Sequence, residues 1–110
     1  MIHRIKAINS PLLLKFTNFI LEYYNVTAGG VCNNEYDVIT TIDECTKALS
    51  ELGYTFKKRY WEGSNRRIPS GCSLRTNKNK RPHLNDKPGL GRGRKDQIPI
   101  CKEVQVNNGN

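Results

Sequence analysis

Four cysteines in a chain of 110 residues constrain this sequence more than any other feature. A chain of this length forms one domain that buries roughly 65% of its unfolded surface, so its core is modest. Small secreted domains compensate for a modest core with disulfides. We therefore expect two disulfides among Cys32, Cys45, Cys72 and Cys101. The alternative is four free thiols in a cytosolic protein.

The clearest helix signal runs from Thr41 to Gly53. Thr41 and Glu44 have the spacing of a capping box, and Gly53 is placed to end the helix in a left-handed turn. The apolar residues between them fall at i, i+3, i+4 and i+7, and they are Cys45, Ala48, Leu49 and Leu52. The sequence therefore predicts a short helix whose cysteine faces the core.

Residues 1–30 predict a separate amphipathic helical segment. Ser10-Pro11 is a favourable helix start. One broad apolar face follows, made of Leu12, Leu13, Phe16, Phe19, Ile20, Tyr23 and Tyr24. Such a helix can pack in a core, remain from a decayed export signal, or bind a membrane or a partner. Lys15 and Glu22 interrupt the apolar run, so the segment is a poor signal peptide and too short and polar to span a membrane.

The rest of the chain predicts a small antiparallel sheet packed on the helix, which is an α+β fold. The segments expected to be extended are Tyr36–Ile39, Tyr54–Phe56 with a continuation at Tyr60 and Trp61, Ile68–Leu74, and Ile98–Cys101. Residues 75–97 are rich in Lys, Arg, Asn, Gly and Pro, which predicts a long mobile basic loop. Residues 107–110 are expected to be a frayed tail. On this interpretation residues 31–106 form the cysteine-rich domain.

The motifs between the first and last cysteine follow a defined order: Cys32, Glu44-Cys45 with Ala48, Leu52-Gly53, Pro69-Ser-Gly-Cys72, Leu84-Asn85 and Ile100-Cys101. This order resembles a small four-cysteine extracellular domain of protist and algal surface proteins, which is loosely similar to PAN/apple domains. The resemblance implies a helix tied to a sheet by disulfides, a strand at Leu84-Asn85, and binding of proteins or carbohydrates. It also implies the pairs Cys45–Cys72 and Cys32–Cys101, one of three connectivities that four cysteines allow.

Charge is the strongest functional signal. Residues 1–56 carry four basic and six acidic side chains, whereas residues 57–110 carry fourteen basic and four acidic ones. A net charge of +10 on the second half predicts an anionic partner, and the alternative is a solvated loop that only keeps the protein soluble. The predicted ligand-binding residues are Lys57, Lys58, Arg59, Trp61, Arg66, Arg67, Lys78, Lys80, Arg81, Arg92, Arg94 and Lys95.

Aromatic residues stand among these cations. Lys57-Lys-Arg59 and Arg66-Arg67 flank Tyr60 and Trp61. Such a mixture can stack on sugars or bases while it pairs with sulfates or phosphates. The two aromatic residues can equally belong to the core. Asn25 begins the sequon Asn25-Val-Thr27, which predicts a glycosylation site if the protein is secreted.

No residue pattern predicts a cofactor, a metal ion or a catalytic centre. Gly89-Leu-Gly-Arg-Gly93 resembles a phosphate-binding loop, but it lacks the preceding strand and the following helix. The cysteines form no Cys-x-x-Cys pair, and His3 and His83 lie in polar contexts, which disfavours zinc. Asp43 and Glu44 are adjacent carboxylates, but their place at a helix start explains them.

Three hypotheses follow. The first is a non-catalytic extracellular or cell-surface binding module, without a transmembrane segment, that engages an anionic glycan or an acidic protein through a basic face. The second is an intracellular, nuclear or cytoplasmic nucleic-acid-binding protein with reduced cysteines, since Lys78-Asn-Lys-Arg81 and Arg92-Gly-Arg-Lys95 resemble a nuclear-localisation segment. The third is a fragment or decayed member of a repeat-containing surface protein, in which residues 1–29 lie outside the ancestral domain.

Overall fold

The computed structural model describes residues 19–106, with side chains described between residues 21 and 104. Within this range the chain forms a five-stranded sheet, one α-helix and one short 3-10 helix. The strands are β1 (Phe19–Asn25), β2 (Trp61–Gly63), β3 (Gly71–Arg75), β4 (Pro82–Asn85) and β5 (Gln97–Val106). The helices are η1 (Glu35–Asp37) and α2 (Ile42–Glu51). The α+β class predicted from the sequence is confirmed.

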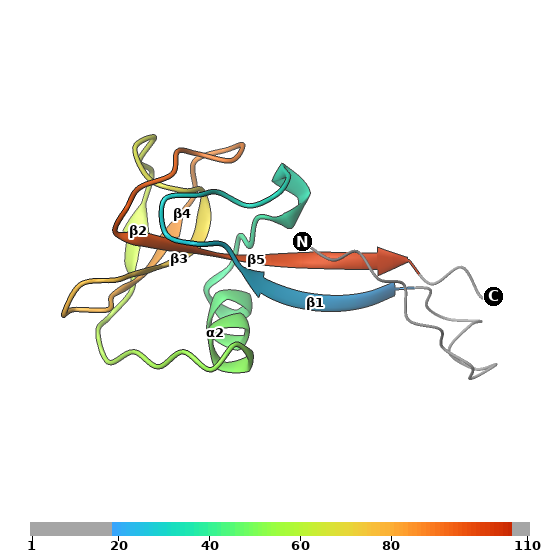
Figure 1. Ribbon diagram of the computed structural model, residues 1–110, viewed down its shortest axis with the longest axis horizontal. Helices are drawn as coiled ribbons and strands as arrows, with labels where there is room; N and C mark the ends of the chain where they lie inside the picture. Colours follow the sequence, from blue (N-terminus) through green and yellow to red (C-terminus); the bar gives the residue numbers. More distant parts are fainter. Residues whose placement is uncertain (1–18, 107–110) are drawn as a thin grey trace.

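The strands lie in the order β1-β5-β3-β4-β2. Neighbouring strands are antiparallel, except that β2 runs parallel to β4. The long strand β5 joins the two ends of the sheet, because its first residues pair with β3 and its remainder pairs with β1. The register with β1 runs from Asn25↔Ile100 to Phe19↔Val106. The resulting β1–β5 ribbon extends away from the body of the protein, while β2, β3 and β4 lie at the opposite end (Figure 1).

The predicted bounds of the helix are confirmed, and both ends are capped. At the start, the Thr41 hydroxyl accepts a hydrogen bond from the Glu44 backbone N–H at 3.2 Å. At the end, Gly53 has a φ of +85°, and the N–H of Tyr54 donates to the carbonyl of Leu49 at 2.9 Å. This is the hydrogen-bond pattern of a Schellman motif. Within residues 19–106, no helix is long and apolar enough to cross a membrane.

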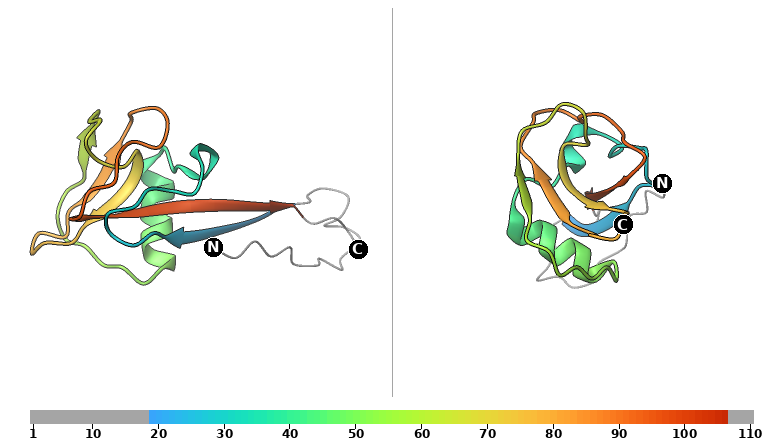
Figure 2. Two further views of the ribbon diagram at one scale, coloured as in Figure 1. Left: turned by 45° about the horizontal axis from the view of Figure 1, so that its top comes forward. Right: turned by 90° about the vertical axis from the view of Figure 1, so that its left-hand side faces the viewer.

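The buried face of α2 packs on the sheet (Figure 2). The main core consists of Ile39, Cys45, Ala48, Leu49, Cys72, Leu74 and Ile100. The two disulfides join the pairs implied by the family resemblance. Cys45 of α2 is bonded to Cys72 of β3, with Cα atoms 5.5 Å apart, and Cys32 is bonded to Cys101 of β5, with Cα atoms 5.9 Å apart. One disulfide therefore fastens the helix to the sheet, and the other fastens the preceding loop to β5.

The predicted amphipathic helix is wrong for Phe19–Asn25, which form β1. Tyr23 packs on the main core and donates a hydrogen bond to the Glu44 carboxylate at 3.2 Å, whereas Tyr24 packs on the second cluster and donates to Asp37. Two successive side chains that serve different clusters are typical of a strand. The sequence predicts a boundary after residue 30, yet β1, which precedes that boundary, belongs to the same sheet as the strands that follow it. The earlier part of the predicted helix lies outside the described residues.

Residues 75–97 do not form one long loop, because β4 lies within them between β3 and β2. A buried amide orders the neighbouring chain. The Asn85 side-chain oxygen accepts from the Asn65 N–H at 2.8 Å, and its amide nitrogen donates to the carbonyls of Asn65 and Pro69 at 2.8 and 2.9 Å. Hydrogen bonds therefore supply order here that apolar composition does not.

Two other expected strands differ from the structure. Tyr36–Ile39 begins within η1, and only Val38 forms an isolated bridge, with Cys101. Tyr54–Phe56 pairs with none of the described strands, although its two aromatic side chains pack on the main core. The expected closing strand at Ile98–Cys101 is confirmed as part of β5.

Two of the three glycines in segment 89–93, Gly91 and Gly93, allow backbones to pack closely. A Cβ atom on Gly91 would lie 2.4 Å from the carbonyl oxygen of Ile68, and one on Gly93 would lie 2.0 Å from that of Gly29. No side chain larger than hydrogen fits such contacts without a backbone shift. Close packing of loops thus explains Gly91 and Gly93, whereas Gly89 has open space around its Cβ position and a φ of +84°.

Candidate anion-binding site

Four lysines from two distant parts of the chain meet around one cavity of about 390 Å³. Lys57 and Lys58 belong to the connection between α2 and β2, and Lys78 and Lys80 belong to the turn between β3 and β4. Both segments lie at the end of the sheet opposite the β1–β5 ribbon (Figure 1). We call this cavity with its four lysines the lysine site. Its other lining residues are Thr55, Phe56 and Asn79.

The connection that carries Lys57 and Lys58 is anchored on both sides. Phe56 and Tyr60 meet edge to face, with ring centroids 5.5 Å apart, and both pack on the main core. The hydroxyl of Tyr60 lies 2.6 Å from that of Thr46 on α2. Residues 57–59, between the two rings, are exposed. The two aromatic residues therefore fix the ends of the basic loop on the core, while the residues between them remain in solvent.

The β3–β4 turn that carries the other two lysines is closed by hydrogen bonds. The Lys80 N–H donates to the Asn77 carbonyl at 3.0 Å, and the Asn77 side chain accepts from the Asn79 N–H at 3.1 Å. Lys80 has a φ of +43° and is the one non-glycine residue with a positive φ in the described part of the chain. The left-handed region costs such a residue about 1 kcal/mol, and strain of this kind tends to occur at functional sites.

The strain at Lys80 gives a first prediction. Lys80→Gly should raise the free energy of unfolding by up to about 1 kcal/mol, because glycine adopts a positive φ without a Cβ clash. The same variant should bind anions less tightly than the wild type. Urea denaturation measures the stability, and retention on a sulfated resin measures the binding. Lys80→Asn is the control, because asparagine tolerates the left-handed region while it removes the charge. Wild-type retention in both variants would exclude Lys80 from the site.

The charges of the lysine site are available to a ligand. None of its four lysines forms an ion pair with a described carboxylate. The nearby arginines differ, because Arg75 and Arg94 both pair with Asp96, at 3.2 and 2.8 Å. Asp96 therefore offsets arginine charge in the adjoining loop and leaves the lysine charge uncompensated.

The expected strength of these contacts indicates what kind of anion the site can hold. An exposed ion pair contributes about 0.2–1 kcal/mol, so four of them supply at most about 4 kcal/mol. That free energy corresponds to a dissociation constant of about 1 mM. A small single anion would be held weakly. The site suits a ligand that carries several charges or that makes a further contact nearby.

The other predicted cations lie outside the lysine site. Arg59 directly follows Lys58 and is exposed. Arg81 precedes β4, is half-buried, and accepts a hydrogen bond through its carbonyl from the Arg75 N–H at 3.1 Å. The remaining ones are exposed on two loops, one after β2 and one before β5: Arg66, Arg67, Arg92, Arg94 and Lys95. Asn25, the residue of the sequon, is exposed at the end of β1.

Trp61 does not line the lysine site but packs within the sheet. It stacks on its register partner His83, with ring centroids 5.3 Å apart and planes inclined by 28°. His83 is buried, and burial lowers its pKa below the usual value, so the imidazole is neutral near pH 7. The pair therefore stabilises the contact between β2 and β4 and adds no charge to the basic surface.

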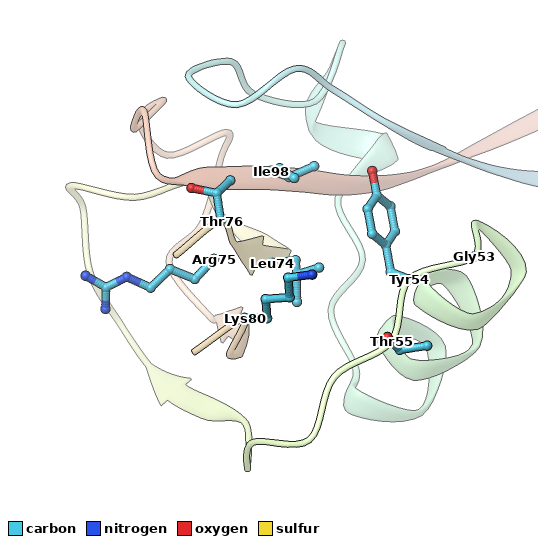
Figure 3. A pocket seen from close by; sticks show the side chains of 8 residues that line it. All are labelled: Gly53, Tyr54, Thr55, Leu74, Arg75, Thr76, Lys80 and Ile98. Carbon is cyan, nitrogen blue, oxygen red and sulfur yellow. The ribbon is translucent and has the colours of Figure 1, made fainter. Parts of the chain in front are cut away.

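A second cavity, of about 250 Å³, adjoins the lysine site and shares Thr55 and Lys80 with it. Figure 3 shows Tyr54 on one side, from the segment that follows α2, and Leu74 and Ile98 on the other, from β3 and β5. We call it the Tyr54 cavity. Its other lining residues are Gly53, Arg75 and Thr76. None of its uncharged residues was predicted from the sequence, since their spacing carries no signal.

The described residues hold no cluster of three His, Cys, Asp or Glu side chains that could bind a metal ion. No protein-family model, curated protein or solved structure matches the chain. The function is therefore argued from the chemistry of the site itself.

Proposed function

We propose that this protein is a non-catalytic extracellular binding module that holds a polyanion, an anionic glycan or an acidic protein segment, at the lysine site. The observation that carries the proposal is the meeting, around one cavity, of four lysines that pair with no carboxylate among the described residues. They come from segments about twenty residues apart in sequence, 57–58 and 78–80, which the fold brings together. The family resemblance noted for the cysteine framework agrees with a binding role.

The disulfides support an extracellular location. All four cysteines are paired, and disulfides persist in oxidising compartments. The competing intracellular hypothesis requires reduced cysteines, yet Cys45 and Cys72 are bonded inside the main core. The same lysines could neutralise phosphates, so a nucleic acid belongs among the ligands to be tested.

Charge reversal at the lysine site is the direct test. Lys57→Glu combined with Lys78→Glu changes one lysine in each segment. This variant should bind a sulfated polysaccharide about thirty-fold more weakly, because two attractive contacts of about 1 kcal/mol each are lost. Isothermal titration calorimetry at two salt concentrations measures the change, and the wild-type affinity should fall as salt rises.

The matched control is Arg66→Glu combined with Arg67→Glu. It alters the net charge by the same amount on an exposed turn that does not line the cavity. We expect a loss of less than about three-fold, since only the long-range field changes. Equal losses in both variants would mean that net charge alone drives binding, and the lysine site would not be the binding site.

A further inference from the structure

We propose that the polyanion is a glycan, and that one sugar ring of it occupies the Tyr54 cavity while its sulfate or carboxylate groups contact the lysine site. This inference rests on the proposed function and narrows it from polyanions in general to anionic saccharides. It starts from the junction of the two cavities. Because both are lined by Thr55 and Lys80, a ligand in one cavity lies next to the other.

The lining of the Tyr54 cavity is mixed in the way that a sugar ring requires. Ile98 and the almost fully buried Leu74 line it with apolar side chains, and the half-buried ring of Tyr54 lies on the other side (Figure 3). Thr55 and Thr76 are exposed threonines at its edge. A pyranose presents C–H groups on its faces and hydroxyls around its rim. It can therefore pack on apolar and aromatic side chains while it hydrogen-bonds at the edge.

The size and the charges of the cavity narrow the ligand further. At about 250 Å³ the cavity is smaller than a pocket for a drug-sized molecule, and its size suits a single sugar ring. Of its two lining cations, Arg75 is paired with Asp96, which leaves the charge of Lys80 for the ligand. Lys80 stands at the junction, where a ring in one cavity carries its charged substituent toward the other three lysines.

Alternative polyanions fit these features less well. An acidic peptide carries its carboxylates on the flexible, acyclic side chains of Asp and Glu, so the group that bears the charge has no ring to fill the Tyr54 cavity. A nucleic acid also has rings. In the extracellular location proposed from the disulfides, however, a glycan is the more accessible ligand. The charge-dense sulfated or uronic-acid saccharides have both the ring and the adjacent anion.

The test compares two sulfated polymers that differ in the ring. Dextran sulfate carries sulfates on sugar rings, whereas poly(vinyl sulfate) carries the same group on a ring-free chain. At matched sulfate concentration, we expect the full chain to bind dextran sulfate at least ten-fold more tightly. Equal affinity for the two polymers would overturn the inference. A single-stranded DNA oligonucleotide is the third probe, and tighter binding to it than to dextran sulfate would also overturn it.

Thr76→Tyr places a larger side chain at the Tyr54 cavity without changing the lysine site, which Thr76 does not line. This variant should lose about ten-fold in affinity for dextran sulfate and keep its affinity for poly(vinyl sulfate), which also reports that the protein is folded. Thr40→Tyr is the control, because Thr40 is an exposed threonine beside another cavity, and it should change neither affinity. Unchanged dextran sulfate binding by Thr76→Tyr would overturn the inference.

Different results would refute the lysine site and the sugar-ring site. If Lys57→Glu with Lys78→Glu binds both sulfated polymers as the wild type does, the lysine site itself is refuted. If that variant loses both polymers while Thr76→Tyr loses neither, the lysine site stands and the sugar ring does not.

Discussion

Replacing Cys45 and Cys72 together with alanine should lower the free energy of unfolding by about 3.5 kcal/mol, because the bond closes a loop of 27 residues. Both cysteines are fully buried in the main core, so the loss of two sulfur atoms also leaves space between α2 and β3. A domain of this size has a total stability of about 5–15 kcal/mol, so the loss is a large part of it. Thermal and urea denaturation measure the change.

The second disulfide provides the comparison. Cys32–Cys101 closes a loop of 69 residues, for which the same chain-entropy argument gives about 4.4 kcal/mol. Reduction of both bonds should therefore remove much of the stability of a domain of this size. Alkylation under denaturing conditions checks the starting state: we expect no label before reduction and four labels after it. Four labels without reduction would show that the protein does not carry these bonds when it is produced in its native host.

Gly71→Ala should destabilise the protein by about 3 kcal/mol, since two costs add at this position. Gly71 begins β3 with a φ of +76°, where an alanine is strained. Its Cβ would also lie 2.5 Å from the carbonyl oxygen of Ile39 and 2.5 Å from a methyl group of Val38. Both neighbours are buried, so the clash is relieved only if β3 moves away from the segment that precedes α2. Urea denaturation measures the loss.

Gly89→Ala separates the two costs. Gly89 has a similar φ of +84°, but no atom lies within 4 Å of the position that its Cβ would take. Its replacement should cost only about 1 kcal/mol, which is the backbone strain alone. If Gly71→Ala lowers the free energy of unfolding no more than Gly89→Ala does, β3 and residues 38–39 can move apart at little cost.

The helix α2 was predictable because all of its signals are local. The Thr41 cap bonds the backbone three residues on, and the bond that closes the turn at Gly53 joins Tyr54 to Leu49. The apolar stripe lies between these two caps. One part of the predicted capping box is absent from the observed contacts. The Glu44 carboxylate lies 3.2 Å from the Tyr23 hydroxyl and 3.5 Å from the Lys102 ammonium, in the β1–β5 ribbon. A local motif thus supplied a residue that the tertiary structure uses for a distant contact.

The strand β1 was not predictable from its own residues. The spacing of apolar side chains before Asn25 fits a helical face, yet pairing with β5 provides backbone partners along all of Phe19–Asn25. A local preference of a few tenths of a kcal/mol per residue is small against such a ladder and the packing of Tyr23 and Tyr24. Similarly, β4 is polar by composition, and the buried Asn85 orders its surroundings through hydrogen bonds that no sequence pattern reveals.

The sequence by itself determined the helix, the closing strand, the need for disulfides and the concentration of positive charge after residue 56. Those features depend on neighbouring residues or on composition. Only the tertiary structure decided which cations act together. It placed Lys57 and Lys58 beside Lys78 and Lys80 around one cavity, and it left the other predicted cations outside that cavity. The reason is that a site made by two segments depends on the pairing of β3 with β4 and on the path that follows α2, and these are non-local contacts.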